Sequence, residues 1–449
     1  MHRVRPPSLL AAALGAIAGL AAQDPLTARV GAALDRARPA LLRHLGRAEL
    51  GELALLLLAA VHDEVPRDHP AMRRAIDRLA RAELDDTYGL SLRLMVMAEL
   101  ADFPDRDALA ARDAALLQRR QTSGGYSYHE HDGWWDLSNT QYAALGLRAA
   151  AALGHDTPRE RWQLLYTSLQ LVQHEDGGFT YRPSQGESSA YASMTVAGIA
   201  VLEVCAQMLA LDGAERRHHD ARVARGWDWM AARSHEIADH RTEHLHYFLY
   251  GLERAAILSD VERIGDVDWY AAGAGLLCDR QLGGGGWYGL DELRRPAPRT
   301  SNGHPVDTAF AVLFLRRKFQ KVQAPVTGPR GLAAAALPAD ADDAAIAAAA
   351  ARDAARGEAA VPRLLLLLHS DARARRCAAA AALRAITRQD FGLRPELEPQ
   401  ADRAAIHGAV LWWLRRQSAA AGPAAGPEGA GTERKRVSRS FAEDREALR

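Results

Sequence analysis

The chain has 449 residues, more than one domain usually contains, so we expect a large domain and a smaller second one. Its 56 Lys and Arg residues equal its 56 Asp and Glu residues, and a chain without net charge has no overall field that attracts nucleic acid or acidic lipid. The three cysteines, Cys205, Cys278 and Cys377, are far apart in apolar stretches. We therefore expect buried thiols, and neither a disulfide framework nor a metal cluster.

The first residues have the pattern of a secretory signal. Arg3 and Arg5 precede a short apolar run that ends at Leu20, and small residues follow before the polar pair at 23–24. We predict a signal peptide over residues 1–22 and hence an exported protein, periplasmic or extracellular, which stays membrane-anchored if the signal is uncleaved. No later segment is judged long and apolar enough to predict a membrane span beyond the signal.

Amphipathic and strongly apolar stretches alternate along the chain up to about residue 320. The amphipathic stretches predict helices near residues 28–46, 70–83, 105–120, 158–173, 217–233 and 266–281. The apolar stretches between them, such as 51–61, 85–100 and 243–258, predict six helices that are buried on most sides. Paired in this order, the helices form six hairpins, and six hairpins can close a ring.

Three of these hairpins share a sequence repeat that begins at Gln121, Gln173 and Gln281. Each repeat continues with glycines, an aromatic residue and then an apolar helix. In the three helices a threonine is followed by a small residue three positions later and a leucine seven positions later, so these side chains share one face; the threonines are Thr140, Thr195 and Thr308. The aromatic residues after the glycines are expected to fill the gap between hairpins; they are Tyr126, Phe179 and Trp287.

The Gln, Gly-Gly and aromatic signature, with Asp307-Thr308 at the start of the last apolar helix, resembles the repeats of the α/α-toroid superfamily. That superfamily includes protein prenyltransferase β subunits, squalene–hopene and oxidosqualene cyclases, and complement-type thioester domains. The resemblance covers residues 28–320 and is strongest to a secreted bacterial branch. It implies an all-α fold, an (α/α)6 toroid with two concentric layers of helices.

Residues 321–345 are rich in Pro, Gly and Ala and are predicted to be a linker. Residues 346–417 resemble a HEAT-type helical unit, because an apolar helix and an Ala-rich helix are separated by a short turn at Ser370 and Asp371. Units of this type usually contact other proteins, so we expect a protein partner here. The tail, residues 418–449, is predicted to be disordered.

The catalytic motifs of the superfamily are incomplete in this sequence. Cyclases protonate an alkene with an Asp-x-Asp-Asp-Thr motif, and here only Asp307 and Thr308 match it. Prenyltransferases hold zinc with an Asp-x-Cys pair, which here reads Asp307 and Ala309 and lacks the sulfur ligand. The thioester Cys-Gly-Glu-Gln sequence is absent. We therefore expect no metal site and no cofactor.

Histidines and aromatic residues cluster where loops are expected to surround the ring. Trp and Tyr offer stacking surface and His can donate or accept protons, so a rim of this kind can bind sugar, peptide or metal. The alternative is simple loop packing. The candidate cavity or rim residues are Tyr126, His129, His131, Trp134, Trp135, His244, His246, Tyr247 and Trp287.

From these observations we predict an exported, non-catalytic scaffold whose toroid cavity binds an apolar or extended ligand. The alternative is an enzyme of terpene-cyclase or polysaccharide-lyase type, in which Asp136, His304 and Asp307 supply acid and base. A third possibility is a filled ring that acts only through protein contacts. An enzyme needs convergent ionisable groups, whereas a binding scaffold needs only an apolar or aromatic lining.

Overall fold

The structure is a computed structural model that describes residues 25–397, except 123, 130–134, 184–188, 212, 290–301, 318–342, 369 and 371, together with parts of 401–416. The predicted signal peptide, the disordered tail and almost all of the linker therefore lie outside the described residues.

The described part of the chain is helical and contains 15 α-helices. Its strands, β1 (Arg263–Ile264) and β2 (Val267–Asp268), form one short antiparallel hairpin. The predicted all-α class is confirmed.

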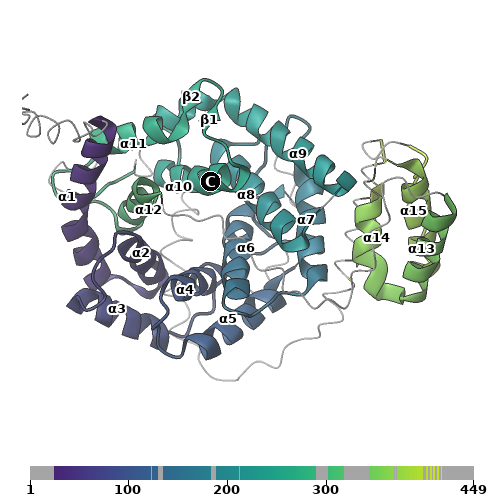
Figure 1. The fold of residues 1–449 in the computed structure, drawn as a ribbon, viewed down its shortest axis with the longest axis horizontal. Coiled ribbons are helices and arrows are strands. Elements are labelled where there is room, and N and C mark those ends of the chain that lie inside the picture. Colours follow the sequence, from purple (N-terminus) through teal and green to yellow (C-terminus); the bar gives the residue numbers. More distant parts are fainter. Residues whose placement is uncertain are drawn as a thin grey trace, which may run out of the picture.

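Six helices lie on the inside of a ring (Figure 1). They are α2 (Leu50–His62), α4 (Thr87–Glu99), α6 (Leu137–Ala152), α8 (Ala192–Leu209), α10 (Leu245–Ser259) and α12 (Pro305–Arg316). Each packs against the next, and α12 packs against α2. Their sequences are apolar on nearly all sides, and a helix of that kind avoids water only when other helices surround it.

Six further helices lie around the inner ones. They are α1 (Pro25–Arg47), α3 (Pro70–Arg81), α5 (Arg106–Arg120), α7 (Arg159–Val172), α9 (Gly213–Ala231) and α11 (Trp269–Arg280). They correspond to the six amphipathic stretches of the sequence and carry charged residues on the side that faces water. In α3, for example, Ala71, Met72, Ala75 and Leu79 are buried while the arginines between them are not.

The shared repeat is a packing device. In three of the inner helices, α6, α8 and α12, the threonine near the helix start accepts a hydrogen bond from the backbone N–H of the aromatic residue in the preceding turn. The distances are 2.9 Å for Thr140 and Tyr126, 3.2 Å for Thr195 and Phe179, and 3.1 Å for Thr308 and Trp287. All three aromatic side chains are fully buried. The repeat thus fixes each glycine turn against the helix that follows it.

The glutamine of each repeat connects its turn to the next outer helix. Gln121 donates to the carbonyl oxygen of Arg161 in α7, and Gln173 to that of Arg222 in α9. Gln281 donates to Ala33 in α1, the first helix of the ring. One side-chain type therefore makes the same contact three times, and the last contact joins the turn after α11 to α1.

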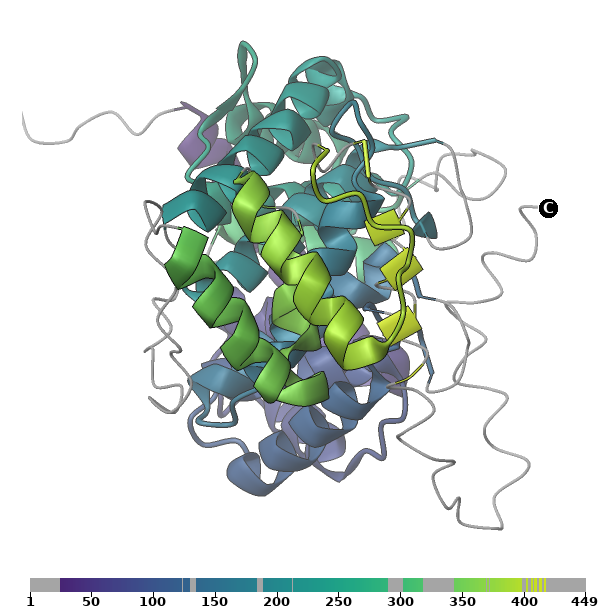
Figure 2. The same cartoon turned by 90° about the vertical axis from the view of Figure 1, so that its right-hand side faces the viewer.

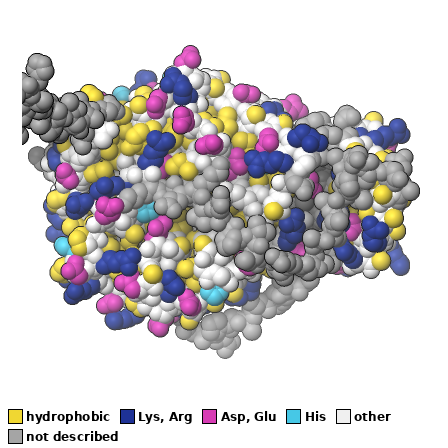
Figure 3. Space-filling view, viewed as in Figure 1, with side chains coloured by type: hydrophobic (Ala, Val, Ile, Leu, Met, Phe, Trp, Pro, Cys, Tyr) yellow, Lys and Arg dark blue, Asp and Glu magenta, His cyan; other side chains and the backbone are white. Residues whose placement is uncertain are grey.

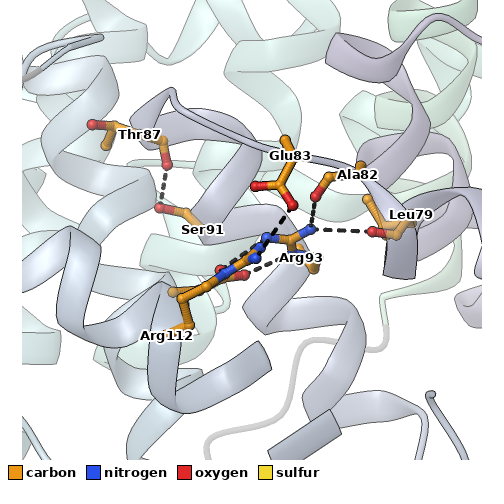
Figure 4. A network of polar contacts seen from close by, with 8 residues as sticks. Leu79, Ala82, Glu83, Thr87, Ser91, Arg93 and Arg112 are labelled. Atoms are coloured by element: carbon orange, nitrogen blue, oxygen red, sulfur yellow. Dashed lines mark hydrogen bonds and ion pairs between the residues drawn. The ribbon is translucent and has the colours of Figure 1, made fainter. Parts of the chain in front are cut away.

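Two buried carboxylates also join helices. Asp113 of α5 accepts hydrogen bonds from Nε and Nη2 of Arg93 in α4. Nη1 of Arg93 donates to the carbonyl oxygens of Leu79 and Ala82 (Figure 4). Asp63, which follows α2, accepts from Arg38 of α1 and Arg316 of α12. The contacts of Asp63 with these two arginines connect the first hairpin to the last.

The C-terminal unit is a small layer of helices beside the ring (Figure 2). It contains α13 (Asp343–Ala355), α14 (Val361–Leu367) and α15 (Arg373–Thr387). Helix α14 packs against α7, where Leu171 joins the apolar core of the unit. The sequence did not predict α13, because a run of alanines has no clear apolar face.

Helix α8 corrects one expectation. It is long and apolar enough to cross a membrane by length and composition, although no such segment was expected after the signal. In the fold it is an inner helix between α6 and α10, and 89% of it is buried. Its apolar character is explained by that packing.

Candidate functional site

The inner helices begin at the same end of the ring. The N–H of Thr87, at the start of α4, donates to Tyr128 in the loop before α6, and the N–H of Leu137, at the start of α6, donates to Tyr181 in the loop before α8. His246 in the first turn of α10 meets Asp307 in the first turn of α12. Side chains from several helix starts therefore converge at this end.

Asp307 is the centre of the strongest polar cluster there. Its Oδ1 lies 3.0 Å from Nδ1 of His246, and its Oδ2 accepts a hydrogen bond of 2.8 Å from the backbone N–H of Gly289. His304, the residue before α12, has its Nδ1 4.0 Å from the same carboxylate. The carboxylate also lies in the first turn of α12, where the helix dipole favours a negative charge.

These contacts keep Asp307 ionised. Burial raises the pKa of its carboxyl, but His246, the Gly289 N–H and His304 together lower it by more, so the pKa lies below the ordinary 3.8. At neutral pH the group is an anion that can accept hydrogen bonds. It is a poor donor of protons.

Two exposed tyrosines lie on the same arc of helix starts. Tyr191, the residue before α8, is 37% exposed, and Tyr288 is 41% exposed and packs edge-on against the His304 ring. They are the exposed large hydrophobic residues in the described part of the chain. We call Tyr191, His246, Tyr288, His304 and Asp307 the rim.

Two further titratable residues border the rim on the side of α1 and α2. Burial raises the pKa of Glu52, in the first turn of α2, although His304 lowers it in part. Burial lowers the pKa of His44, whose Nε2 lies 3.1 Å from the carbonyl oxygen of Asn302. On the face seen in Figure 3, acidic and basic side chains are interspersed.

Three of the predicted rim residues belong to the packing repeat instead. Tyr126 and Trp287 are fully buried, and the Trp287 indole donates to the carbonyl oxygen of Leu277. Trp135 is 2% exposed and covers Gly125, where an added Cβ would come within 2.4 Å of the indole. The glycine turn is thus closed by the tryptophan, which has no surface left for a ligand.

The remaining predicted rim residues have different environments. His246 is on the rim, and Tyr247 lies just below it, with its hydroxyl 3.0 Å from Ser138 Oγ. His129 is half-buried, and its Nδ1 lies 3.3 Å from the carbonyl oxygen of Asp85. His244 precedes α10 in a left-handed conformation with a largely exposed side chain. His131 and Trp134 lie outside the described residues.

Of the three predicted catalytic residues, the structure brings two together. His304 and Asp307 share the rim, as described above. Asp136 is fully buried at the start of α6 and accepts hydrogen bonds from the backbone and side chain of Asn139. It is therefore a helix cap.

Among the described residues, no group of three His, Cys, Asp or Glu side chains is placed to hold a metal ion. The three cysteines form no disulfide bond; Cys205 is buried as expected, while Cys278 and Cys377 are half-buried. Burial raises the pKa of the Cys205 thiol, which is therefore protonated and unreactive.

Sequence reasoning missed Tyr191, Tyr288, Glu52 and His44. Tyr288 directly follows the buried Trp287, and only the loop conformation turns one ring inward and the next outward. Tyr191 had a detectable signal, because it stands four residues before Thr195 at a predicted helix start.

No protein-family model and no curated protein sequence matches the chain. Among solved structures, the chain is similar to the apo form of the type II terpene cyclase MstE from Scytonema, with a TM-score of 0.42 and 14% identity over 65% of this chain and 98% of that one. A variant of the same cyclase in complex with geranylgeranyl dihydroxybenzoate gives a TM-score of 0.42 and 14% identity over 67% of this chain and 99% of that one. The chain is thus an all-α protein with structural similarity to a helical terpene cyclase.

Proposed function

We propose that the chain is an exported (α/α)6-toroid protein that binds an extended ligand at its rim and does not catalyse a reaction. The packing of α12 against α2, together with the Gln281 and Asp63 contacts, supports six hairpins in a closed ring. The C-terminal helices form a HEAT-like unit in this proposal. Because α14 packs against α7, the helices that remain available to a protein partner are α13 and α15.

The observation that carries the proposal is the placement of Tyr191 and Tyr288. Partly exposed aromatic rings offer a flat surface on which a ligand can stack, and both lie at the end of the ring where the His246–Asp307 pair is found. Such rings stack on sugar rings or peptide groups, while the carboxylate accepts hydrogen bonds from hydroxyls.

The ionised carboxylate also favours one class of ligand. A purely apolar molecule that covered Asp307 would remove the remaining water from an anion without replacing its hydrogen bonds, which costs free energy. A ligand rich in hydroxyl groups replaces them. We therefore favour a polysaccharide chain over an apolar ligand.

A panel of β-glucan, chitin and peptidoglycan oligosaccharides tests this proposal by native mass spectrometry and fluorescence titration. The wild-type chain is expected to retain at least one of them, and the double variant Tyr191→Ala/Tyr288→Ala to bind it at least tenfold more weakly. Trp412→Ala is the matched control, because this half-buried aromatic residue belongs to the C-terminal unit. Equal affinity of the wild type and the double variant would refute the proposal.

The second candidate is an enzyme of polysaccharide-lyase or terpene-cyclase type. The His246–Asp307 contact favours it, because a carboxylate that orients an imidazole is an arrangement found in general bases. The low pKa of Asp307 argues against the cyclase form, which needs a strong proton donor. Cleavage products from the bound oligosaccharide, formed by the wild type and lost in Asp307→Asn without loss of binding, would favour the lyase.

A further inference from the structure

A cluster of aromatic side chains surrounds Arg254 inside the ring. We call Tyr88, Tyr142, Tyr247, Tyr250 and Phe310 the tyrosine cage. Its ring centroids are 4.1 Å apart for Tyr88 and Tyr142, 6.4 Å for Tyr142 and Tyr247, and 5.7 Å for Tyr250 and Phe310. The members come from α4, α6, α10 and α12, so the cage spans the interior between helices that are not all neighbours.

Arg254 is fully buried in this cage. Its Nη2 donates to the Gln141 side-chain oxygen at 2.7 Å, and its guanidinium carbon lies 4.0 Å from the centre of the Tyr250 ring. Its Nε and Nη1 make no hydrogen bond within the described part of the chain. The hydroxyls of Tyr142 and Tyr250 are also buried and lie close to the guanidinium, but within the described residues neither makes a hydrogen bond of good geometry.

Arg93 shows how the same fold satisfies a buried arginine. Its guanidinium donates to both oxygens of Asp113 and to the carbonyl oxygens of Leu79 and Ala82, so all three of its nitrogens have an acceptor (Figure 4). Arg254 is equally buried but has one amide oxygen and the faces of two tyrosine rings. The Arg93 guanidinium is therefore hydrogen-bonded to a carboxylate, whereas no carboxylate of the described residues is hydrogen-bonded to the Arg254 guanidinium.

A buried guanidinium without an anion is unfavourable, and arginine cannot escape by losing its proton. Burial lowers the pKa of Arg254, but the oxygens of Tyr142 and Tyr250 raise it by more, so the group stays charged. Buried polar groups in native proteins are nearly always hydrogen-bonded, and a buried cluster without protein partners is a place where an ordered water or an ion binds. Within the described residues, two guanidinium nitrogens and two hydroxyls lie together here without a well-aligned hydrogen-bond partner.

We propose that the tyrosine cage binds a carboxylate, which pairs with Arg254 and accepts hydrogen bonds from Tyr142 and Tyr250. A single positive charge is balanced by a single negative charge, so a monoanionic carboxylate fits better than a phosphate dianion. The aromatic rings around it can contact an apolar body attached to the carboxylate. This site is independent of the rim, and either can exist without the other.

Calorimetric titration of the full-length chain in HEPES buffer free of other small anions tests the site with acetate, hexanoate and chloride at equal ionic strength. Saturable binding of a carboxylate, at least tenfold tighter than any binding of chloride, supports the proposal. Tighter binding of hexanoate than of acetate assigns the carboxylate to a larger apolar molecule, and the reverse assigns it to a small free acid. Equal binding of chloride, or no binding of any probe, would overturn the proposal.

Variants separate this site from general salt effects. Arg254→Met is expected to abolish carboxylate binding, and Tyr142→Phe and Tyr250→Phe to weaken it about tenfold each by removing one hydroxyl. Arg241→Met is the matched control, since Arg241 is exposed and paired with Asp239. Carboxylate binding that persists in Arg254→Met would contradict the assignment.

Thermal unfolding in the same buffer gives a second readout. Arg254→Met is expected to leave the melting temperature unchanged or raised, because it removes an uncompensated charge, whereas Arg93→Met is expected to lower it by about 5 °C or more. If Arg254→Met destabilises the protein as much as Arg93→Met, Arg254 is already satisfied and the proposal fails.

Discussion

Replacing Asp63 by asparagine tests whether its ion pairs with Arg38 and Arg316 stabilise the packing of the first hairpin against the last. The Asp63 carboxylate is 1% exposed, and it accepts hydrogen bonds of 2.8 Å from Arg38 and from Arg316, which is 253 residues away in the sequence. Breaking a buried ion pair on one side costs about 3–5 kcal/mol because a charge is left without a partner. The arginine side chains are 38% and 21% exposed, so water compensates part of this loss and we expect about 2–3 kcal/mol.

Chemical and thermal unfolding measure this effect. For a domain of this size, a loss of 2–3 kcal/mol corresponds to a melting temperature lower by about 4–6 °C. Asp102→Asn is the matched control, because Asp102 and its partner Arg67 are both half exposed or more, and we expect about 0.5 kcal/mol or less there. The reasoning is refuted if Asp63→Asn destabilises the chain no more than Asp102→Asn.

Three further predictions concern the first turns and the repeat. Asp307→Asn is expected to destabilise the chain by about 1 kcal/mol at pH 7, since the carboxylate is only partly shielded from water. Because the folded-state pKa of Asp307 is lowered, its contribution is present above pH 3.8 and is lost as the pH falls below that value, so wild-type and variant unfolding curves should converge in acid. Thr195→Val removes the acceptor of the Phe179 N–H and should cost about 1–3 kcal/mol in urea unfolding; a cost below 0.5 kcal/mol would argue against the packing role of the repeat. Gly198→Ala places a Cβ 2.6 Å from the Phe179 ring and should cost about 1–3 kcal/mol by the same assay, and a neutral or stabilising change would contradict the close packing.

The sequence predicted the helices of the ring because their signals are local. Apolar spacing located both layers to within a few residues, and the repeated Gln and Thr positions make the same contacts in the three hairpins that share the repeat. The roles of Tyr126 and Trp287 as fillers between hairpins were predicted correctly from this repeat. Both were also candidates for a cavity or rim, and both are fully buried, because a residue type that stacks on ligands also packs well in a core.

Contacts between residues that are far apart in the sequence could not be predicted from local sequence patterns. Nothing near Asp63 in the sequence indicates Arg316, and nothing near Arg254 indicates that it crosses to Gln141 of α6. The candidate acid Asp136 looked like Asp307 because both stand at helix starts. Only the three-dimensional neighbours distinguish a buried helix cap from a carboxylate on the rim.

The central claim is that the rim is the ligand-binding surface, and hydrogen–deuterium exchange tests it most directly. The exchange is compared with and without an oligosaccharide from the β-glucan, chitin and peptidoglycan panel. We predict slower exchange at residues 286–289 and in the first turns of α8, α10 and α12, where Tyr191, His246 and Asp307 lie. Protection confined to α13 and α15 would contradict the claim and would place the binding surface on the C-terminal unit.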